Sequence, residues 1–279
     1  MLAQQLVGQG DLASALKELQ GQIRKDAANA KLRVFLFQLL CVMGDWARAL
    51  TQLNVAAELD ADTLPMAQTY RTAIECEALR DAIFAGKRTP LIFGEPTTWL
   101  AQLLDALKHD AAAPETAASM RAQAFDAAPT STGSINGEPF EWLADADPRL
   151  GPVLEAIVNG RYFWIPLCRI RRIEIEPPVD LRDAVWTAAS FTWANGAQTV
   201  GLIPTRYNAT AASGDNALLL SRRTEWSDAA PGQAIGQRML VTDRGDYPLM
   251  EARVIEFETV DEAASEGGHT SEDGAGGNG

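Results

Sequence analysis

The apolar residues in the first part of the chain follow the pattern of amphipathic helices. Apolar side chains recur every three or four positions, which places them on one face of a helix. Two such faces are formed by Leu12, Ala15, Leu16, Leu19 and Ile23 and by Leu32, Phe35, Leu36, Leu39, Leu40 and Met43. Similar spacing predicts further helices over residues 65–85, 99–109 and 114–127.

One segment of this helical region occurs twice. Residues 10–16 return as residues 44–50, and each copy begins with glycine and aspartate and ends with alanine and leucine. The glycine can end one helix in the left-handed conformation, and the aspartate can cap the next. The offset of 34 residues is the period of the tetratricopeptide repeat, a helix pair that stacks on neighbouring pairs. We therefore expect a helical repeat domain over residues 1–127, with 65–85 as a degenerate third unit.

The second half of the chain has a different pattern, made of short β-rich runs. It follows a polar stretch at 128–139, which we interpret as a linker or a large loop. A short helix is predicted at 153–158, and strands are predicted at 162–167, 170–175, 199–204, 217–220, 238–242 and 251–257, with a hairpin turn at Asn195-Gly196. The chain is thus expected to have two domains, α and α+β, the second being mostly antiparallel and covering 140–259. Residues 260–279, rich in glycine and acids, are expected to be a disordered tail.

Charge and composition argue against several classes of function. The net charge of −13 disfavours binding to nucleic acid or to anionic membranes, because both need a basic face. Without a long apolar run or a signal-peptide pattern, we expect a cytoplasmic protein with no membrane contact. The three cysteines and two histidines show no metal-ligand spacing, and a glycine-rich phosphate loop is absent, so no metal or cofactor is predicted.

The best candidate for chemistry is a cluster of acidic residues. Glu141, Asp145 and Asp147 lie close together in the sequence with Arg149. Two carboxylates can act as general acid and base or hold a divalent cation. The alternative is that they close turns and cap the helix predicted after Asp147-Pro148, and we favour this structural interpretation.

Two other groups of residues are candidates for binding a protein. One face of the predicted helix after residue 30 lies opposite its packing residues and offers a mixed groove of Lys31, Val34, Gln38 and Cys41. The second group, Thr205-Arg206-Tyr207, follows a proline and can form an exposed recognition loop. Arginine and aromatic side chains dominate the hot spots of protein interfaces, which is why this loop is a candidate.

The motifs of the second half resemble a known family. The resemblance rests on residues 140–152 and 159–166, with Asp180-Leu181-Arg182-Asp183, Trp186, Asn195-Gly196 and Ile203-Pro204-Thr205-Arg206-Tyr207. These segments are similar to the ImpE family, also called TagJ-like or SciE-type accessory proteins of the bacterial type VI secretion system. That family also has a repeat-like helical first half, so the resemblance covers residues 1–258.

The resemblance implies a cytoplasmic, non-enzymatic adaptor. Its implied partner is the small subunit of the contractile sheath, bound through that subunit's N-terminal helix, with an indirect link to the sheath-disassembly ATPase. The family supplies no catalytic residues, and its signature corresponds here to Trp142, Asp145, Asp147, Arg149, Tyr162, Trp164, Arg182, Asp183, Trp186, Thr205, Arg206 and Tyr207. Two interpretations of these residues stay open: they bind the partner, with Trp142, Asp145, Asp147, Arg149 and Arg182 as candidates, or they hold the second domain together. Arg182 and Asp183 are expected to pair in a local turn or helix. Two alternatives stay open, a self-associating scaffold and an enzyme that uses the acidic cluster in a cleft between the domains.

Overall fold

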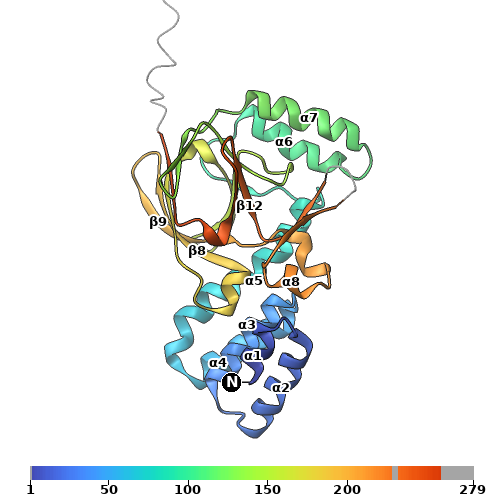
Figure 1. Cartoon of the computed structure of the whole chain (residues 1–279), viewed down its shortest axis with the longest axis vertical. Helices are drawn as coiled ribbons and strands as arrows, with labels where there is room; N and C mark the ends of the chain where they lie inside the picture. The colour runs from blue at the N-terminus through green and yellow to red at the C-terminus, as the bar shows by residue number, and fades with distance from the viewer. Residues whose placement is uncertain (1, 228–231, 259–279) are drawn as a thin grey trace, which may run out of the picture.

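The first half of the structure consists of helices. The computed structural model describes residues 2–227 and 232–258. The helices are α1 (Leu2–Gly8), α2 (Leu12–Lys25), α3 (Ala30–Val42), α4 (Trp46–Leu59), α5 (Leu64–Phe84), α6 (Thr98–His109) and α7 (Pro114–Ala127), as predicted. Figure 1 shows α1–α4 at one end of the long axis and the α6–α7 hairpin at the other. None of the described helices has the length and apolar composition needed to cross a membrane.

Both predicted repeat turns consist of a left-handed glycine followed by a capping aspartate. Gly10 and Gly44 have φ angles of 83° and 74°. The Asp11 carboxylate accepts a hydrogen bond from the backbone N–H of Ser14 at 2.9 Å. In the second copy, Asp45 accepts one from the backbone N–H three residues later at 3.3 Å. The pairs α1–α2 and α3–α4 are therefore two copies of one unit, which confirms the repeat.

The second half is built on a large sheet that is mostly antiparallel. The sheet has nine strands in the order β1-β6-β5-β9-β8-β7-β14-β2-β3, in which β1–β6 is parallel and the other described pairs are antiparallel. Two smaller sheets contain β4, β12 and β13 in one case and β10 and β11 in the other. The strands are β1 (Leu91–Ile92), β2 (Gly133–Ile135), β3 (Glu138–Phe140), β4 (Leu143–Asp145), β5 (Val153–Val158), β6 (Arg161–Pro166), β7 (Ile170–Ile175), β8 (Trp186–Trp193), β9 (Gln198–Pro204), β10 (Thr224–Trp226), β11 (Ala234–Gly236), β12 (Met239–Thr242), β13 (Asp246–Pro248) and β14 (Val254–Phe257). The expected fold class is confirmed.

Two predicted elements of this half are wrong. Residues 153–158 form strand β5 and not a helix, with all six side chains buried and with pairing to β6 and β9. A short continuous apolar run fits a strand covered on both faces as well as a buried helix, so periodicity does not distinguish the two. Most of 217–220, predicted as a strand, belongs to α8 (Asn216–Leu219). This helix forms because the Asp215 carboxylate accepts hydrogen bonds from the N–H groups of Ala217 and Leu218.

The stretch 128–139, expected as a linker or large loop, is partly a β-hairpin. Asn136 and Gly137 join β2 to β3 with φ angles of 53° and 85°, the positive values that a two-residue hairpin turn of type I′ requires. β2 also pairs with β14, so this segment belongs to the large sheet. The other predicted strands are confirmed, with β14 shorter than expected, as is the Asn195-Gly196 turn between β8 and β9.

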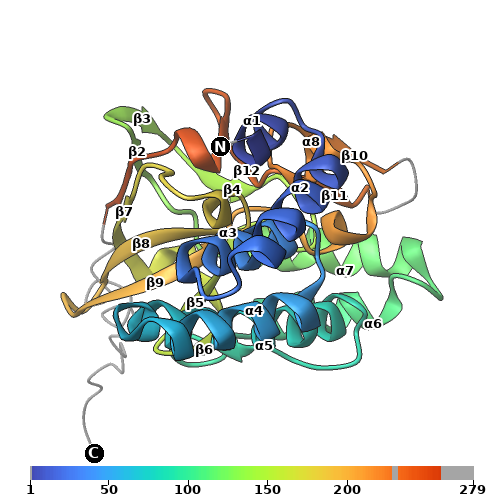
Figure 2. The same cartoon turned by 90° about the horizontal axis from the view of Figure 1, so that it is seen from below.

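One hydrophobic core runs through both halves. It contains Phe37 and Tyr70 from the helices together with Trp164 and Trp186 from the strands. The ring centroid of Trp186 lies 5.8 Å from that of Tyr70 and 5.7 Å from that of Trp46. Figure 2 shows α3, α4 and α5 lying across the strands of the large sheet. The repeats are therefore packed directly against the β-rich half.

Candidate functional site

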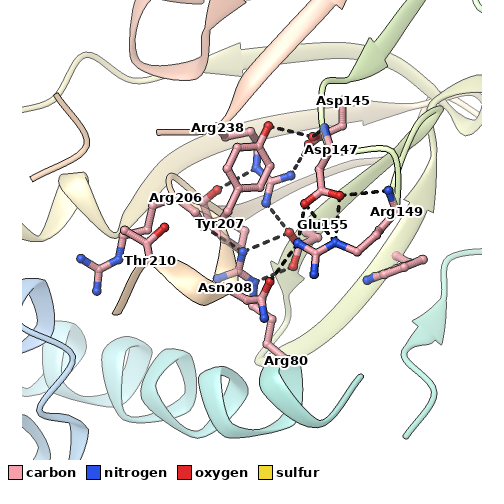
Figure 3. A network of polar contacts seen from close by, with 12 residues as sticks. Arg80, Asp145, Asp147, Arg149, Glu155, Arg206, Tyr207, Asn208, Thr210 and Arg238 are labelled. Atoms are coloured by element: carbon pink, nitrogen blue, oxygen red, sulfur yellow. Dashed lines mark hydrogen bonds and ion pairs between the residues drawn. The ribbon is translucent and has the colours of Figure 1, made fainter. Parts of the chain in front are cut away.

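Charged side chains form a buried network where the helical half meets the β-rich half (Figure 3). Arg80 comes from α5, Glu155 from β5 and Asp145 from the end of β4, while Arg238 directly precedes β12. The Arg80 guanidinium donates to the Glu155 carboxylate at 2.5 and 3.1 Å. Arg238 donates to both Glu155 and Asp145. All four side chains belong to residues that are at most 4 % exposed, so water does not screen these ion pairs.

Neutral donors complete the network. Tyr162 donates its hydroxyl hydrogen to Glu155 and accepts a hydrogen bond from the indole N–H of Trp164 at 2.9 Å. The Tyr207 hydroxyl donates to Asp145 at 2.9 Å. Buried carboxylates are stable in a protein when their oxygens are bonded in this way. The network therefore has a structural role, because it connects α5 with β4, β5 and the start of β12.

The acidic cluster predicted from the sequence is not assembled as a site. Glu141 is exposed, whereas Asp145 and Asp147 are buried. Asp147 accepts hydrogen bonds from the backbone N–H of Arg149 at 2.9 Å and from its guanidinium at 2.5 Å. Asp147 therefore closes a turn, but it caps no helix, since strand β5 follows. Within residues 2–227 and 232–258, no three histidines, cysteines or carboxylates are grouped in a way that could hold a metal ion.

The pKa values of the two network carboxylates are shifted in opposite directions. Burial raises the pKa of Asp145 to about 6, although the positive charge of Arg238 opposes this shift. Burial would also raise the pKa of Glu155, but Arg80 and Arg238 together lower that pKa to about 2. Glu155 therefore stays ionised near neutral pH, whereas Asp145 takes up a proton in mild acid.

We expect Asp145→Asn to remove a pH dependence of the free energy of unfolding that the wild type shows. The pKa of Asp145 in the folded protein lies above its ordinary value of 3.8, so the folded state binds this proton more tightly than the unfolded state. As the pH falls from 7 to 4, protonation should favour folding by about 2 kcal/mol. Urea unfolding across this range measures the difference in free energy of unfolding between wild type and variant. A difference that does not change with pH would contradict the raised pKa.

Two arginines of the second half bind the C-terminal ends of α1 and α3, the first helix of each repeat. Arg206 donates to the last two carbonyl oxygens of α3 at 2.7 and 3.0 Å. Arg222 donates to the last two carbonyl oxygens of α1, both at 3.0 Å. The two carbonyl pairs stand at equivalent positions of the repeats, 34 residues apart. Each arginine thus donates to carbonyl oxygens at a helix end, where intrahelical donors run out, and the carbonyls of Val7 and Cys41 also accept from the backbone N–H groups of Gly10 and Gly44.

The segment 205–207 is not the exposed recognition loop that we predicted. Thr205, Arg206 and Tyr207 are 0 %, 2 % and 1 % exposed. The Thr205 hydroxyl donates to the carbonyl oxygen of Asp183 at 2.6 Å, Arg206 reaches α3, and Tyr207 bonds Asp145. These three consecutive side chains connect separate elements, so they have no surface to offer a partner.

The groove predicted on α3 is largely covered by the chain itself. Lys31 is exposed and Val34 is half-buried, but Gln38 and Cys41 are buried. The covering elements come from the second half, where the turn η3 (Leu181–Ala184) packs on α3 and Arg206 reaches its end. Only the first turns of this face are open to a partner.

Trp142 and Arg182 have different environments. Trp142 is 41 % exposed, which leaves its indole available for contact. Arg182 is half-buried over the ring of Tyr70, with 4.7 Å from its guanidinium carbon to the ring centroid. The predicted pair of Arg182 with Asp183 is wrong, because Arg182 pairs with Asp180. Asp183 instead accepts hydrogen bonds from the backbone N–H groups of Val179 and Asp180, directly before η3.

Four members of the network were not recognised from the sequence, namely Arg80, Glu155, Arg238 and Glu77, whose carboxylate pairs with Arg80 at 3.3 Å. Three of them carry a signal that could have been used. Glu77 and Arg80 lie on the apolar stripe of α5, and Glu155 interrupts the apolar run of β5. A charge within an apolar stripe indicates a buried partner of opposite sign. Arg238 shows no such signal in its local sequence.

The network residues of the second half, Asp145, Glu155, Tyr162, Tyr207 and Arg238, fall within a segment that matches a family model, whereas Arg80 does not. The model of the ImpE protein matches residues 137–256, and a tetratricopeptide repeat model matches residues 6–74. TagJ of Pseudomonas aeruginosa PAO1, described as a type VI secretion system accessory component, is 55 % identical over 262 residues, which cover 94 % of this chain and 92 % of TagJ. The chain belongs to the ImpE, or TagJ-like, family. The resemblance seen in the sequence motifs is thus confirmed.

A solved structure shares the fold. The crystal structure of VPA1032 from Vibrio parahaemolyticus matches with a TM-score of 0.82, covering 94 % of this chain and 100 % of that one. The two sequences are 24 % identical, so the match supports the fold alone. Residues 75–136, which include α6 and α7, lie outside both family models.

Proposed function

We propose that this chain is a cytoplasmic accessory component of a type VI secretion system that works as an adaptor and catalyses no reaction. Its partner is the small subunit of the contractile sheath, bound through that subunit's N-terminal helix. Binding modulates sheath assembly or disassembly, and the disassembly ATPase is affected only indirectly. The observation that carries the proposal is the 55 % identity to TagJ over nearly the whole chain.

The chemistry of the buried network supports an adaptor over an enzyme. A general acid or base has to reach the proton that it transfers. Asp145, Asp147 and Glu155 are buried, and their oxygens already bond arginines and tyrosines. Helical repeats, in contrast, are an architecture that presents extended surfaces to other proteins.

Isothermal titration with a peptide of the subunit's N-terminal helix tests the proposal. We expect saturable binding with a negative heat-capacity change, because an amphipathic helix buries apolar surface when it binds. The small sheath subunit without this helix is the matched control and should not bind.

Two results would contradict the adaptor proposal. One is the absence of heat and of any shift on a sizing column with both the peptide and the whole subunit. The other is equal binding of the subunit with and without its first helix, which would place the contact elsewhere on the subunit.

A further inference from the structure

An open groove runs along α6, away from the buried network. It holds about 620 Å³ and lies between α7 on one side and the segment after α5 on the other. It is lined by Thr89, Thr98, Ala101, Gln102, Leu104, Asp105, Lys108 and Met120. Most of the lining surface is apolar, with the methyl group of Ala101 exposed and Leu104 and Met120 half-buried.

The shape of the groove suits a helix better than an extended peptide. Its lining residues on α6 include positions 98, 101, 104, 105 and 108, which follow one face of the helix for about 15 Å. An extended peptide gains affinity from the free backbone groups of a sheet edge, and the interior of a helix offers none. A helix satisfies its own backbone and packs its side chains along such a face, and the small side chain of Ala101 lets it approach closely.

One end of the groove carries positive charge. Lys87 and Arg88 directly precede Thr89 of the lining, and both are exposed. A Cβ on Gly86 would lie 2.9 Å from the Cα of Lys108, so this segment lies against the C-terminal part of α6. Lys108 is paired with Asp105 at 2.7 Å. Neither Lys87 nor Arg88 has a side-chain hydrogen bond or ion pair with any residue in the described ranges. Their charges are therefore available to an acidic partner.

The groove also lies on a more open part of the surface than the face of α3 does. The second half of the chain covers the end of α3, so the usual repeat face offers little room. The α6–α7 hairpin, in contrast, lies at the far end of the molecule from α1–α4 (Figure 1). In a chain with a net charge of −13, an unpaired Lys-Arg pair beside an apolar groove favours a partner with acidic groups.

We propose that the groove along α6 binds an amphipathic α-helix of the partner, with acidic residues of that helix facing Lys87 and Arg88. This inference rests on the proposed function for the identity of the partner, whose helix is that of the small sheath subunit. Acidic residues are most stable in the first turn of a helix. The bound helix therefore begins near the C-terminal end of α6 and runs antiparallel to it, an arrangement that also aligns the two helix dipoles favourably.

Titration of the purified full-length chain with the small sheath subunit tests the groove. Ala101→Arg places a long charged side chain across the groove and should weaken binding by more than about tenfold. The double variant Lys87→Glu/Arg88→Glu should weaken binding by about tenfold at low salt, with a smaller effect at high salt. All of these positions are exposed, so the melting temperatures should stay close to that of the wild type.

Two control variants separate this groove from other surfaces. Ala122→Arg places the same change on α7, at an exposed residue outside the lining. Lys31→Glu reverses a charge on the open part of α3. Both should bind within about twofold of the wild type. A peptide in which lysines replace the acidic residues should regain binding to Lys87→Glu/Arg88→Glu, which a purely structural effect would not produce.

The possible outcomes distinguish this inference from the proposed function. Wild-type binding with unchanged affinity in Ala101→Arg and in the charge-reversal variant overturns the groove and leaves the adaptor role standing. Loss of affinity in Lys31→Glu with none in Ala101→Arg also overturns it and moves the site to α3. Absence of wild-type binding overturns both proposals.

Discussion

Replacing Arg238 with methionine should lower the free energy of unfolding by about 3–5 kcal/mol, because a broken buried ion pair leaves a charge without its partner. Arg238 is fully buried, and its guanidinium contacts both Asp145 and Glu155. Methionine is also long and flexible, so the substitution removes the charge and the hydrogen bonds with a smaller change in packing. Asp145 would then keep only neutral donors, and Glu155 would keep the guanidinium of Arg80 and the hydroxyl of Tyr162.

Urea unfolding at neutral pH, followed by circular dichroism, measures this effect. Arg48→Met is the matched control, because Arg48 pairs with Asp45 while 51 % of its side chain is exposed. Exposed ion pairs contribute about 0–1 kcal/mol, so this control should be nearly neutral. Equal, small losses in both variants would show that the buried ion pairs of Arg238 contribute no more to stability than an exposed pair.

Trp186→Ala should also lower the free energy of unfolding by about 3–5 kcal/mol. Trp186 is fully buried at the start of β8, and its ring packs on Tyr70 of α5 and Trp46 of α4. Its indole N–H donates to Glu77 at 2.8 Å. The substitution opens a cavity between the repeats and the sheet and leaves the Glu77 carboxylate with fewer partners.

A second tryptophan provides the control for this substitution. Trp142 is 41 % exposed, so Trp142→Ala should cost no more than about 1 kcal/mol. Thermal and urea unfolding of the two variants under the same conditions give the comparison. If Trp142→Ala destabilises the protein as much as Trp186→Ala, the aromatic contacts between the halves are not what stabilises their packing.

Elements with local signals were predictable from the sequence. The glycine and aspartate at 10–11 and at 44–45 end one helix and cap the next through contacts that span a few residues. The same holds for the turn at Asn195-Gly196, because the turn conformation depends on its own residues. Where the local signal was ambiguous, as in the apolar run 153–158, the strand became evident only from its pairing with β6 and β9.

The candidate binding residues were recognisable by type but not by exposure. Arg206 and Tyr207 are residue types found in binding hot spots, and both are buried. Arg206 bonds α3 across a sequence separation of 164 positions, so no local pattern reveals that contact. Gln38 lies on α3 and is buried as well, and η3, which is distant in the sequence, packs on that helix.

The sequence by itself determined the 34-residue repeat, the strands β6, β7, β9, β12 and β14, and the membership in the ImpE family. Helix period, helix caps and hairpin turns depend on neighbouring residues, so they can be read along the chain. Only the tertiary structure decided that the second half covers the repeat face and that Arg80, Glu155 and Arg238 share one buried network. Burial and ion pairing depend on contacts between residues from distant parts of the chain, and the spacing of residues along the sequence does not show which of them are in contact.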